Sequence, residues 1–289
     1  MLTKETTQDT FFLKKSTINC KGKLVNLDEL LVMGILNLTP DSFFDGGLHH
    51  NEENIIAQVQ KMLDNGATII DVGGYSSRPG ADEVSEDEEI QRVVPVIELL
   101  TKQFPEIIIS IDTFRSEVAK QAINAGAALI NDISAGELDT NMFTTVKTLQ
   151  VPYIMMHMQG TPATMQNEPS YTNITHEVID FFAKKVNDLN CLGVNDIIID
   201  PGFGFGKTVE HNYELLNQLN QFEILDLPLL VGFSRKSMIN KVINTTPQEA
   251  LNGTTTLNTL ALSKGANILR VHDVLEAKQA VDLYKKMKA

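Results

Sequence analysis

Side chains that can bind ions or exchange protons recur at one kind of place in this sequence, where a short apolar run ends. In chain order they are Asn37, Asp71, Asp112, Asn131 with Asp132, His157, Asp200, Ser234 with Arg235 and Lys236, and Arg270 with His272. Carboxylates and amides together can pair with a ligand edge that offers donors beside acceptors. A lysine just before a predicted helix favours an anion. Alternatively, some of these groups only cap the next helix, as position alone allows for Asp112 and Asp273.

Two loops with glycines follow the first two of these runs. Residues 39–47 read TPDSFFDGG, and residues 73–81 read GGYSSRPGA. The second loop combines glycines, hydroxyls and Arg78, which suits a flexible flap that closes over an anion. An ordinary mobile loop is the alternative, but such a loop would not require Arg78.

A third glycine-rich stretch, residues 200–208, reads DPGFGFGKT. It is not a phosphate-binding P-loop, because the spacing G-x-x-x-x-G-K-[ST] would need glycine where Pro201 stands. We interpret its glycines as letting the backbone and Phe205 approach a planar ligand closely. Lys207 either belongs to the site or faces solvent. His157 is either a packed structural histidine or a catalytic one, and the sequence leaves both interpretations open.

Apolar runs and helical patterns alternate along the chain. The runs predict strands at 31–37, 68–72, 107–112, 128–132, 152–157, 196–200, 228–234 and 267–272. Amphipathic spacing and capping residues predict helices at 51–65, 85–103, 116–124, 139–149, 173–192, 208–219, 246–262 and from 273 onward.

Eight strand–helix units predict an α/β protein whose parallel sheet closes into a (β/α)8 TIM barrel. We expect a single domain over residues 1–289, with the barrel from about 31 to 289. The extension at residues 10–30 is expected to form a hairpin at the barrel bottom. Catalytic residues of such barrels lie at the C-terminal ends of the strands, which is where the groups above stand. An open, doubly wound sheet is the alternative architecture.

Composition limits the partners. The net charge of −13 argues against nucleic acid, because nucleic-acid-binding proteins need a positive footprint. It leaves small anionic ligands possible, since a local cluster of cations can oppose the overall field. Cys20 and Cys191 lie far apart and form no C-x-x-C pair, so we expect reduced thiols. Residues 1–23 lack the apolar segment of a secretory signal, and no apolar run reaches the ~18 residues of a membrane span. We therefore expect a cytoplasmic protein with no membrane partner.

Eight motifs, in order, resemble those of the dihydropteroate synthase family, pterin-binding enzymes of folate biosynthesis. They lie at residues 34–47, 70–81, 110–115, 130–134, 156–162, 199–208, 231–236 and 269–273. The resemblance implies a (β/α)8 barrel, usually a homodimer, that uses Mg²⁺ and is a sulfonamide target. It also implies a transferase that joins 6-hydroxymethyl-7,8-dihydropterin pyrophosphate to p-aminobenzoate. The products would be 7,8-dihydropteroate and pyrophosphate.

Carried over position by position, the resemblance implies a role for each matched residue. The pterin would be bound by Asp112, Asn131, Asp200, Lys236 and Arg270. The pyrophosphate would be bound by Asn37, Arg270 and His272, and the metal by Asn37. The p-aminobenzoate and the closing loops would involve Phe43, Ser77, Arg78, Pro79, Phe205 and Ser234. The catalytic set would be Asp112, Asp200, Lys236 and Asp45.

The second loop departs from the family pattern, which commonly reads GGESTRPG. Here Tyr75 replaces the glutamate and Ser77 replaces the threonine. Ser77 keeps the hydroxyl but loses a methyl group. Contact with p-aminobenzoate and with sulfonamides could therefore differ, whereas the reaction need not.

Three other functions compete with this interpretation. A methyltransferase that moves a methyl group from methyltetrahydrofolate to a corrinoid protein would share the barrel and the use of Asp and Asn side chains to bind a pterin. It does not explain residues 39–47 or Arg78. A metal-dependent hydrolase could use His157, Asp200 and His272, but such sites often carry an H-x-H on a strand, which is missing here. A pterin-binding protein without catalysis is the third.

Overall fold

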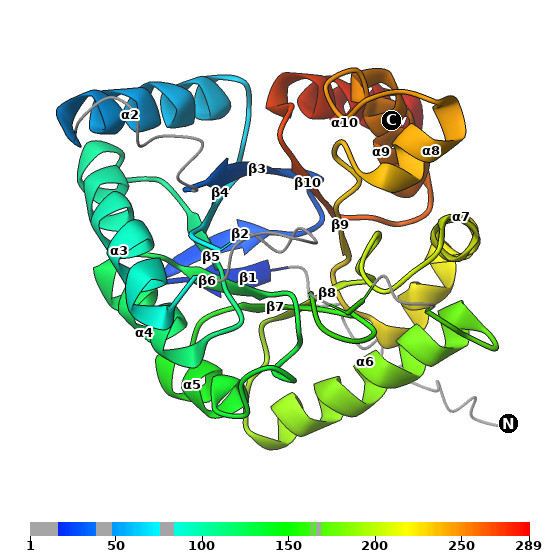
Figure 1. Cartoon of the computed structure of the whole chain (residues 1–289), viewed down its shortest axis with the longest axis horizontal. Coiled ribbons are helices and arrows are strands. Elements are labelled where there is room, and N and C mark those ends of the chain that lie inside the picture. Colours follow the sequence, from blue (N-terminus) through cyan, green and yellow to red (C-terminus); the bar gives the residue numbers. More distant parts are fainter. Residues whose placement is uncertain (1–16, 39–47, 76–83, 163, 166–168) are drawn as a thin grey trace, which may run out of the picture.

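The protein is a closed ring of parallel strands surrounded by helices (Figure 1). The computed structural model describes residues 17–38, 48–75, 84–162, 164–165 and 169–289. The strands of the ring are β3 (Leu31–Asn37), β4 (Ile69–Gly73), β5 (Ile109–Asp112), β6 (Leu129–Asp132), β7 (Tyr153–Met156), β8 (Ile197–Asp200), β9 (Leu230–Val231) and β10 (Ile268–Val271).

The ring closes through its hydrogen bonds. Neighbouring strands follow the order β8-β7-β6-β5-β4-β3-β10-β9, with all pairs parallel. A parallel bridge between Ile199 and Leu229 then joins the two ends of that order. The predicted TIM barrel is therefore confirmed, and the alternative of an open, doubly wound sheet is excluded.

Helices follow the strands and cover the outside of the ring. They are α2 (Leu48–Asp64), α3 (Glu86–Gln103), α4 (Ser116–Ala125), α5 (Met142–Leu149), α6 (Ile174–Cys191), α7 (Val209–Asn217), the 3-10 helix η2 (Leu219–Leu225), α8 (Ser237–Ile243), α9 (Leu251–Ser263) and α10 (Val274–Lys288). Within the ranges that the structure describes, none of these helices is long and apolar enough to cross a membrane.

Alternation along each strand separates two cores. Outward-facing residues such as Leu36 and Val72 are buried against helix residues such as Val59 and Val93. Inward-facing residues near the amino ends of the strands form a second apolar cluster inside the ring, exemplified by Ile69. Further along the strands the inward positions become polar. The period-2 pattern thus places a charged layer on top of an apolar one.

A hairpin fills the amino end of the ring, as predicted from residues 10–30. Its strands β1 (Thr17–Cys20) and β2 (Lys23–Asn26) pair antiparallel, and Ile18 and Val25 join the inner apolar cluster. The Lys21 ammonium donates to the Ile123 carbonyl at 2.9 Å, at the end of α4. The hairpin therefore seals the end opposite to the charged layer; residues 10–16 lie outside the described part of the chain.

Three helix starts and one strand differ from the prediction. Helix α2 begins at Leu48, three residues before the predicted start. Thr246 does not begin α9: the Glu249 amide donates to the Thr246 carbonyl, a turn contact, and the helix begins only at Leu251. Asp139 does not begin α5, because its carboxylate accepts from the Ser116 amide at the start of α4.

Strand β9 is shorter than predicted and ends at Val231. Beyond it the chain turns, since the Lys236 amide donates to the Phe233 carbonyl at 3.0 Å. The helix expected after Lys236 is present as the short α8.

Candidate active site

The carboxyl ends of four strands meet around one guanidinium group. Arg270 on β10 donates from Nε to Asp71 Oδ2 at 2.6 Å and from Nη2 to Asp112 Oδ2 at 2.5 Å. Asn131 on β6 donates from Nδ2 to the same Asp71 oxygen at 3.0 Å. Residues that are far apart in the sequence thus form one hydrogen-bonded group inside the ring. Three of its members, Asp112, Asn131 and Arg270, were predicted as site residues.

Asp71 was not assigned a role from the sequence, although it was noted as a strand end. It is completely buried and is the shared acceptor for Arg270 and Asn131. Its other carboxylate oxygen, Oδ1, is buried and has no hydrogen-bond partner among the residues that the structure describes. The contact between Asp71 and Arg270 was not visible in the sequence, because the two residues lie near opposite ends of the barrel sequence. They meet because β4 and β10 lie on either side of β3.

Burial and charge oppose each other at these groups. Burial raises the pKa of Asp112 to about 7, although the Arg270 guanidinium acts to lower it. Burial also raises the pKa of Asp200, against the Lys236 ammonium and the Gly202 amide, which donates to Asp200 at 2.8 Å. For Arg270, burial alone would lower the pKa, but Asp71 and Asp112 raise it. Arg270 therefore stays charged beside Asp71 and Asp112.

Lys236 forms the other side of the site. Its ammonium donates to the Phe203 carbonyl at 2.5 Å and lies 4.7 Å from the centre of the Phe205 ring. Burial lowers the pKa of Lys236 to about 8, and Asp200 acts in the opposite direction. The predicted residues Asp200, Phe205 and Lys236 are therefore neighbours, joined by the loop that follows β8.

Ser234 and His272 pair beside this loop. The His272 backbone amide donates to Ser234 Oγ at 3.2 Å, and the ring nitrogen Nδ1 lies 3.0 Å from the same oxygen. Arg235 behaves differently, because its guanidinium contacts Asp273 with two nitrogens, at 2.6 and 3.1 Å. Arg235 thus ties the loop after β9 to the start of α10.

The alternative that Asp112 caps a helix is wrong. The Asp112 carboxylate faces Arg270, and the N-cap residue of α4 is Arg115. Asp273 does occupy the N-cap position of α10, as its place in the sequence suggested, but its side chain makes no capping hydrogen bond to that helix and instead accepts from Arg235.

Lys207 does not face solvent, so the exposed interpretation of this lysine is wrong. Its side chain is buried, and its ammonium lies 3.0 Å from His157 Nδ1. Burial and, to a smaller extent, the Lys207 ammonium together lower the pKa of His157 to about 2. His157 is therefore a neutral, packed histidine, whose ring also meets Phe181 edge-on with centres 5.0 Å apart.

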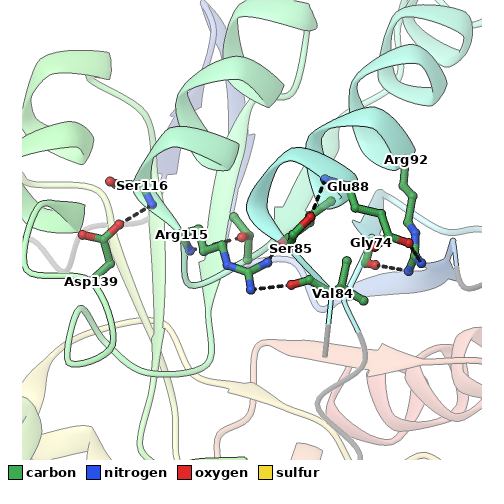
Figure 2. Close-up of polar contacts among 10 residues, drawn as sticks. Gly74, Val84, Ser85, Glu88, Arg92, Arg115, Ser116 and Asp139 are labelled. Carbon is green, nitrogen blue, oxygen red and sulfur yellow. Dashed lines mark hydrogen bonds and ion pairs between the residues drawn. The ribbon is translucent and has the colours of Figure 1, made fainter. Parts of the chain in front are cut away.

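Arg115 and Arg92 bind the described ends of the second loop (Figure 2). Arg92 donates to the Gly74 carbonyl at 3.0 Å, and Arg115 donates to the Val84 carbonyl at 2.7 Å. Arg115 also pairs with the buried Glu89. Five predicted site residues, Phe43, Asp45, Ser77, Arg78 and Pro79, lie outside the described residues.

Asn37 ends β3, opposite Gly73 of β4 in the ladder. It is half-buried at the same end of the ring as Asp112. Over the described ranges, no group of three or more His, Cys, Asp and Glu side chains could hold a metal ion by itself. The hydrolase alternative, which needs such a group, therefore gains no support from the described residues.

Comparisons with known proteins agree with this geometry. The profile of the family "Pterin binding enzyme" matches residues 33–272. Dihydropteroate synthase of Escherichia coli (strain K12) is 44% identical over 263 residues, which cover 90% of this chain and 93% of that protein. Dihydropteroate synthase of Haemophilus influenzae is 47% identical over 255 residues, with coverages of 88% and 92%.

Solved structures show the same fold. The Yersinia pestis dihydropteroate synthase, crystallised with a sulfonamide drug complex, superposes with a TM-score of 0.88 at 42% identity, over 94% of this chain and 99% of that chain. The chain therefore belongs to the pterin binding enzyme family. Within that family it groups with the dihydropteroate synthases, as its motifs predicted.

Acid should destabilise the protein through His157. Its folded-state pKa of about 2 lies below the ordinary value of 6.5, so only the unfolded chain binds a proton between these values. Stability from this group is complete above pH 6.5 and is lost as the pH falls. We expect His157→Asn to remove up to about 1.4 kcal/mol per pH unit from the slope of unfolding free energy below pH 6.

Denaturant unfolding at several pH values measures this slope. His176→Asn is the matched control, because the His176 side chain is exposed. Parallel curves for the wild type and His157→Asn would show that His157 takes no part in acid unfolding.

Proposed function

We propose that this chain condenses 6-hydroxymethyl-7,8-dihydropterin pyrophosphate with p-aminobenzoate and releases 7,8-dihydropteroate and pyrophosphate. The observation that carries the proposal is the hydrogen-bonded group of Asp71, Asp112, Asn131 and Arg270 at the carboxyl end of the barrel, in which Asp71 and Asn131 are buried and Asp112 and Arg270 are half-buried. Such a set of carboxylates, an amide and a cation matches a heterocycle that carries donors beside acceptors. The chain's relatives named dihydropteroate synthase support the same reaction.

The pterin is proposed to lie against Asp112, Asn131 and Asp200, with Lys236 and Arg270 beside it. A site built from buried polar groups discriminates strongly, because a ligand that lacks a matching donor leaves a group unpaired. Burial raises the pKa of Asp112 to about 7 and also raises the pKa of Asp200. The ionised form of each carboxylate is therefore stabilised when a cation or a hydrogen-bond donor approaches. Both are therefore suited to a ligand that becomes positively charged.

The proposed reaction begins with departure of the pyrophosphate. The C–O bond breaks, its electron pair leaves with the pyrophosphate oxygen, and a cationic pterin methylene remains. Asp112 and Asp200 stabilise this cation electrostatically. The p-aminobenzoate nitrogen then forms the new C–N bond and releases a proton. Asp45 is proposed to take part in catalysis from the first loop.

The pyrophosphate is proposed to meet Arg270, His272 and Asn37. Mg²⁺ usually keeps several waters and is bound by one or two protein oxygens together with substrate phosphates. A single amide oxygen at Asn37, without a preformed metal cluster in the described residues, fits such a substrate-carried ion. When bound, Mg²⁺ would supply charge neutralisation of the leaving group.

The p-aminobenzoate is proposed to lie on the Phe205 side of the site. Phe205 lies next to Lys236, and Ser234 lies next to His272. The Lys236 ammonium and the Ser234 hydroxyl can both receive a carboxylate. Three residues of the second loop, Ser77, Arg78 and Pro79, and Phe43 of the first loop are proposed to complete this half-site. Closing loops of this kind exclude water from the reacting atoms.

Turnover tests the proposal. Pyrophosphate release should require both substrates. Asp112→Asn should fold but lower kcat by roughly 10²–10³-fold, the usual effect of removing one electrostatic stabiliser of a transition state. Coupled detection of pyrophosphate measures the rate, and a melting curve checks the fold. Near-normal turnover of the folded variant would remove Asp112 from the mechanism.

Binding tests the pyrophosphate contact. Arg270→Ala should weaken binding of the pyrophosphate ester by about 10-fold or more beyond any effect on free pterin, because hydrogen bonds to charged groups contribute about 1.5–3 kcal/mol. Chelation of Mg²⁺ should show the same selectivity. Arg235→Ala is the control, since Arg235 contacts Asp273. Equal losses for ester and free pterin would mean that Arg270 does not bind the phosphate groups.

A homodimer in the cytoplasm is also proposed. Three large apolar side chains are exposed on the adjacent helices α8 and α9, namely Val242, Ile243 and Leu260. Exposed apolar patches often mark protein interfaces. Sedimentation should give twice the chain mass of 32.0 kDa, and Ile243→Asp should shift the protein toward one chain. A monomeric wild type would contradict the dimer.

A further inference from the structure

A buried lysine beneath the loop that follows β8 has no role in the reaction above. The Lys207 ammonium lies 3.0 Å from the carbonyl oxygens of Gly202 and Phe205, 3.3 Å from that of His157, and 3.0 Å from His157 Nδ1. An ammonium carries three donors and no acceptor, so converging oxygens and a neutral imidazole are the partners it requires. Burial of a cation is costly unless such partners are present. This lysine is therefore built into the loop.

The loop needs an internal anchor because its backbone is unusual. Gly202, Gly204 and Gly206 all have positive φ, at +71°, +84° and +60°. A Cβ on Gly202 would lie 1.9 Å from the His157 carbonyl oxygen, so the loop presses directly on the end of β7. Turned in this way, the loop directs the carbonyls of Gly202 and Phe205 inward, where both accept hydrogen bonds from the Lys207 ammonium.

The opposite side of the same loop faces the site. The Phe203 carbonyl accepts from Lys236 at 2.5 Å, and the Phe205 ring lies 4.7 Å from that ammonium. The Gly202 amide donates to Asp200 at 2.8 Å. Two lysines thus bracket one short loop, with Lys207 inside and Lys236 at the mouth.

We propose that Lys207 is a positioning residue, which fixes Phe205 and the Phe203 carbonyl so that Lys236 and the aromatic ring can receive p-aminobenzoate. This inference rests on the proposed function. Lys207 does not touch the reacting atoms in this arrangement; it acts through the backbone of residues 202–206. His157 contributes as the neutral acceptor on its Nδ1 atom. The pterin contacts on β5 and β6 do not depend on this lysine.

Lys207→Met tests the inference, because methionine has a similar length but no donor. We expect faster hydrogen–deuterium exchange in residues 201–206 of the protein without ligands. In kinetics, kcat/KM for p-aminobenzoate should fall by roughly 10²-fold, mainly through KM, since small displacements of a site cost about this much. The KM for the pterin pyrophosphate should change less, because two of its contacts, Asn131 and Asp112, are held by Asp71 and Arg270 and not by this loop. Lys207→Gln, which keeps an amide donor, should recover part of both losses.

Lys264→Met is the matched control, since half-buried Lys264 also donates to a backbone carbonyl, that of Asn217. It should alter neither readout. Unchanged exchange in Lys207→Met, or a loosened loop with an unchanged KM for p-aminobenzoate, would overturn the inference. If Lys207→Met does not fold, Lys207→Gln alone decides between the same outcomes. A wild type that releases no pyrophosphate would refute the proposed function, whereas the exchange result would still report whether Lys207 holds the loop.

Discussion

The ion pairs of Arg270 with Asp71 and Asp112 are the interaction on which the site depends. A guanidinium inside a barrel is stable only if carboxylates and hydrogen-bond acceptors replace the water it has lost. Asp71 supplies one oxygen to Arg270 and to Asn131 at the same time. These hydrogen bonds link the carboxyl ends of strands β4, β5, β6 and β10 to one another. Removing either carboxylate would leave charge unpaired as well as remove a contact.

Charges at the mouth are balanced across the ring. Three carboxylates, Asp71, Asp112 and Asp200, lie near the cations Arg270 and Lys236 at the mouth and Lys207 beneath the loop after β8. The pKa shifts of Asp200 and of the three cations show this mutual influence. Such a balance suits a reaction in which the C–O bond to pyrophosphate breaks and leaves a cationic methylene and an anionic leaving group. Each product of that separation meets groups of the opposite sign that are already in place, so little reorganisation is needed.

Local signals in the sequence predicted the barrel well. A short β-branched run that ends at Asp112 or Asp200 indicates a buried strand and the point where that strand ends. Eight such runs predict the architecture. Partners were harder to predict. The pairing of Asp71 with Arg270 depends on the placement of β4 and β10 on either side of β3, which no local pattern encodes. Residues 246–249 have the sequence of a helix N-cap but form a turn instead. The side-chain contact between Thr246 and Glu249 is compatible with either structure.

Lys207 shows most clearly why a lysine's role is hard to predict from sequence. Lysine is almost always exposed, so its type alone favours solvent. Its burial follows from the positive-φ glycines, which turn the carbonyls of Gly202 and Phe205 toward one point. The apolar layer and the hairpin at the far end of the ring make this arrangement tolerable, because they supply the burial that a polar mouth cannot. Stability and chemistry are therefore divided between the two ends of the same strands, and the change from Ile69 to Asp71 on β4 marks the boundary.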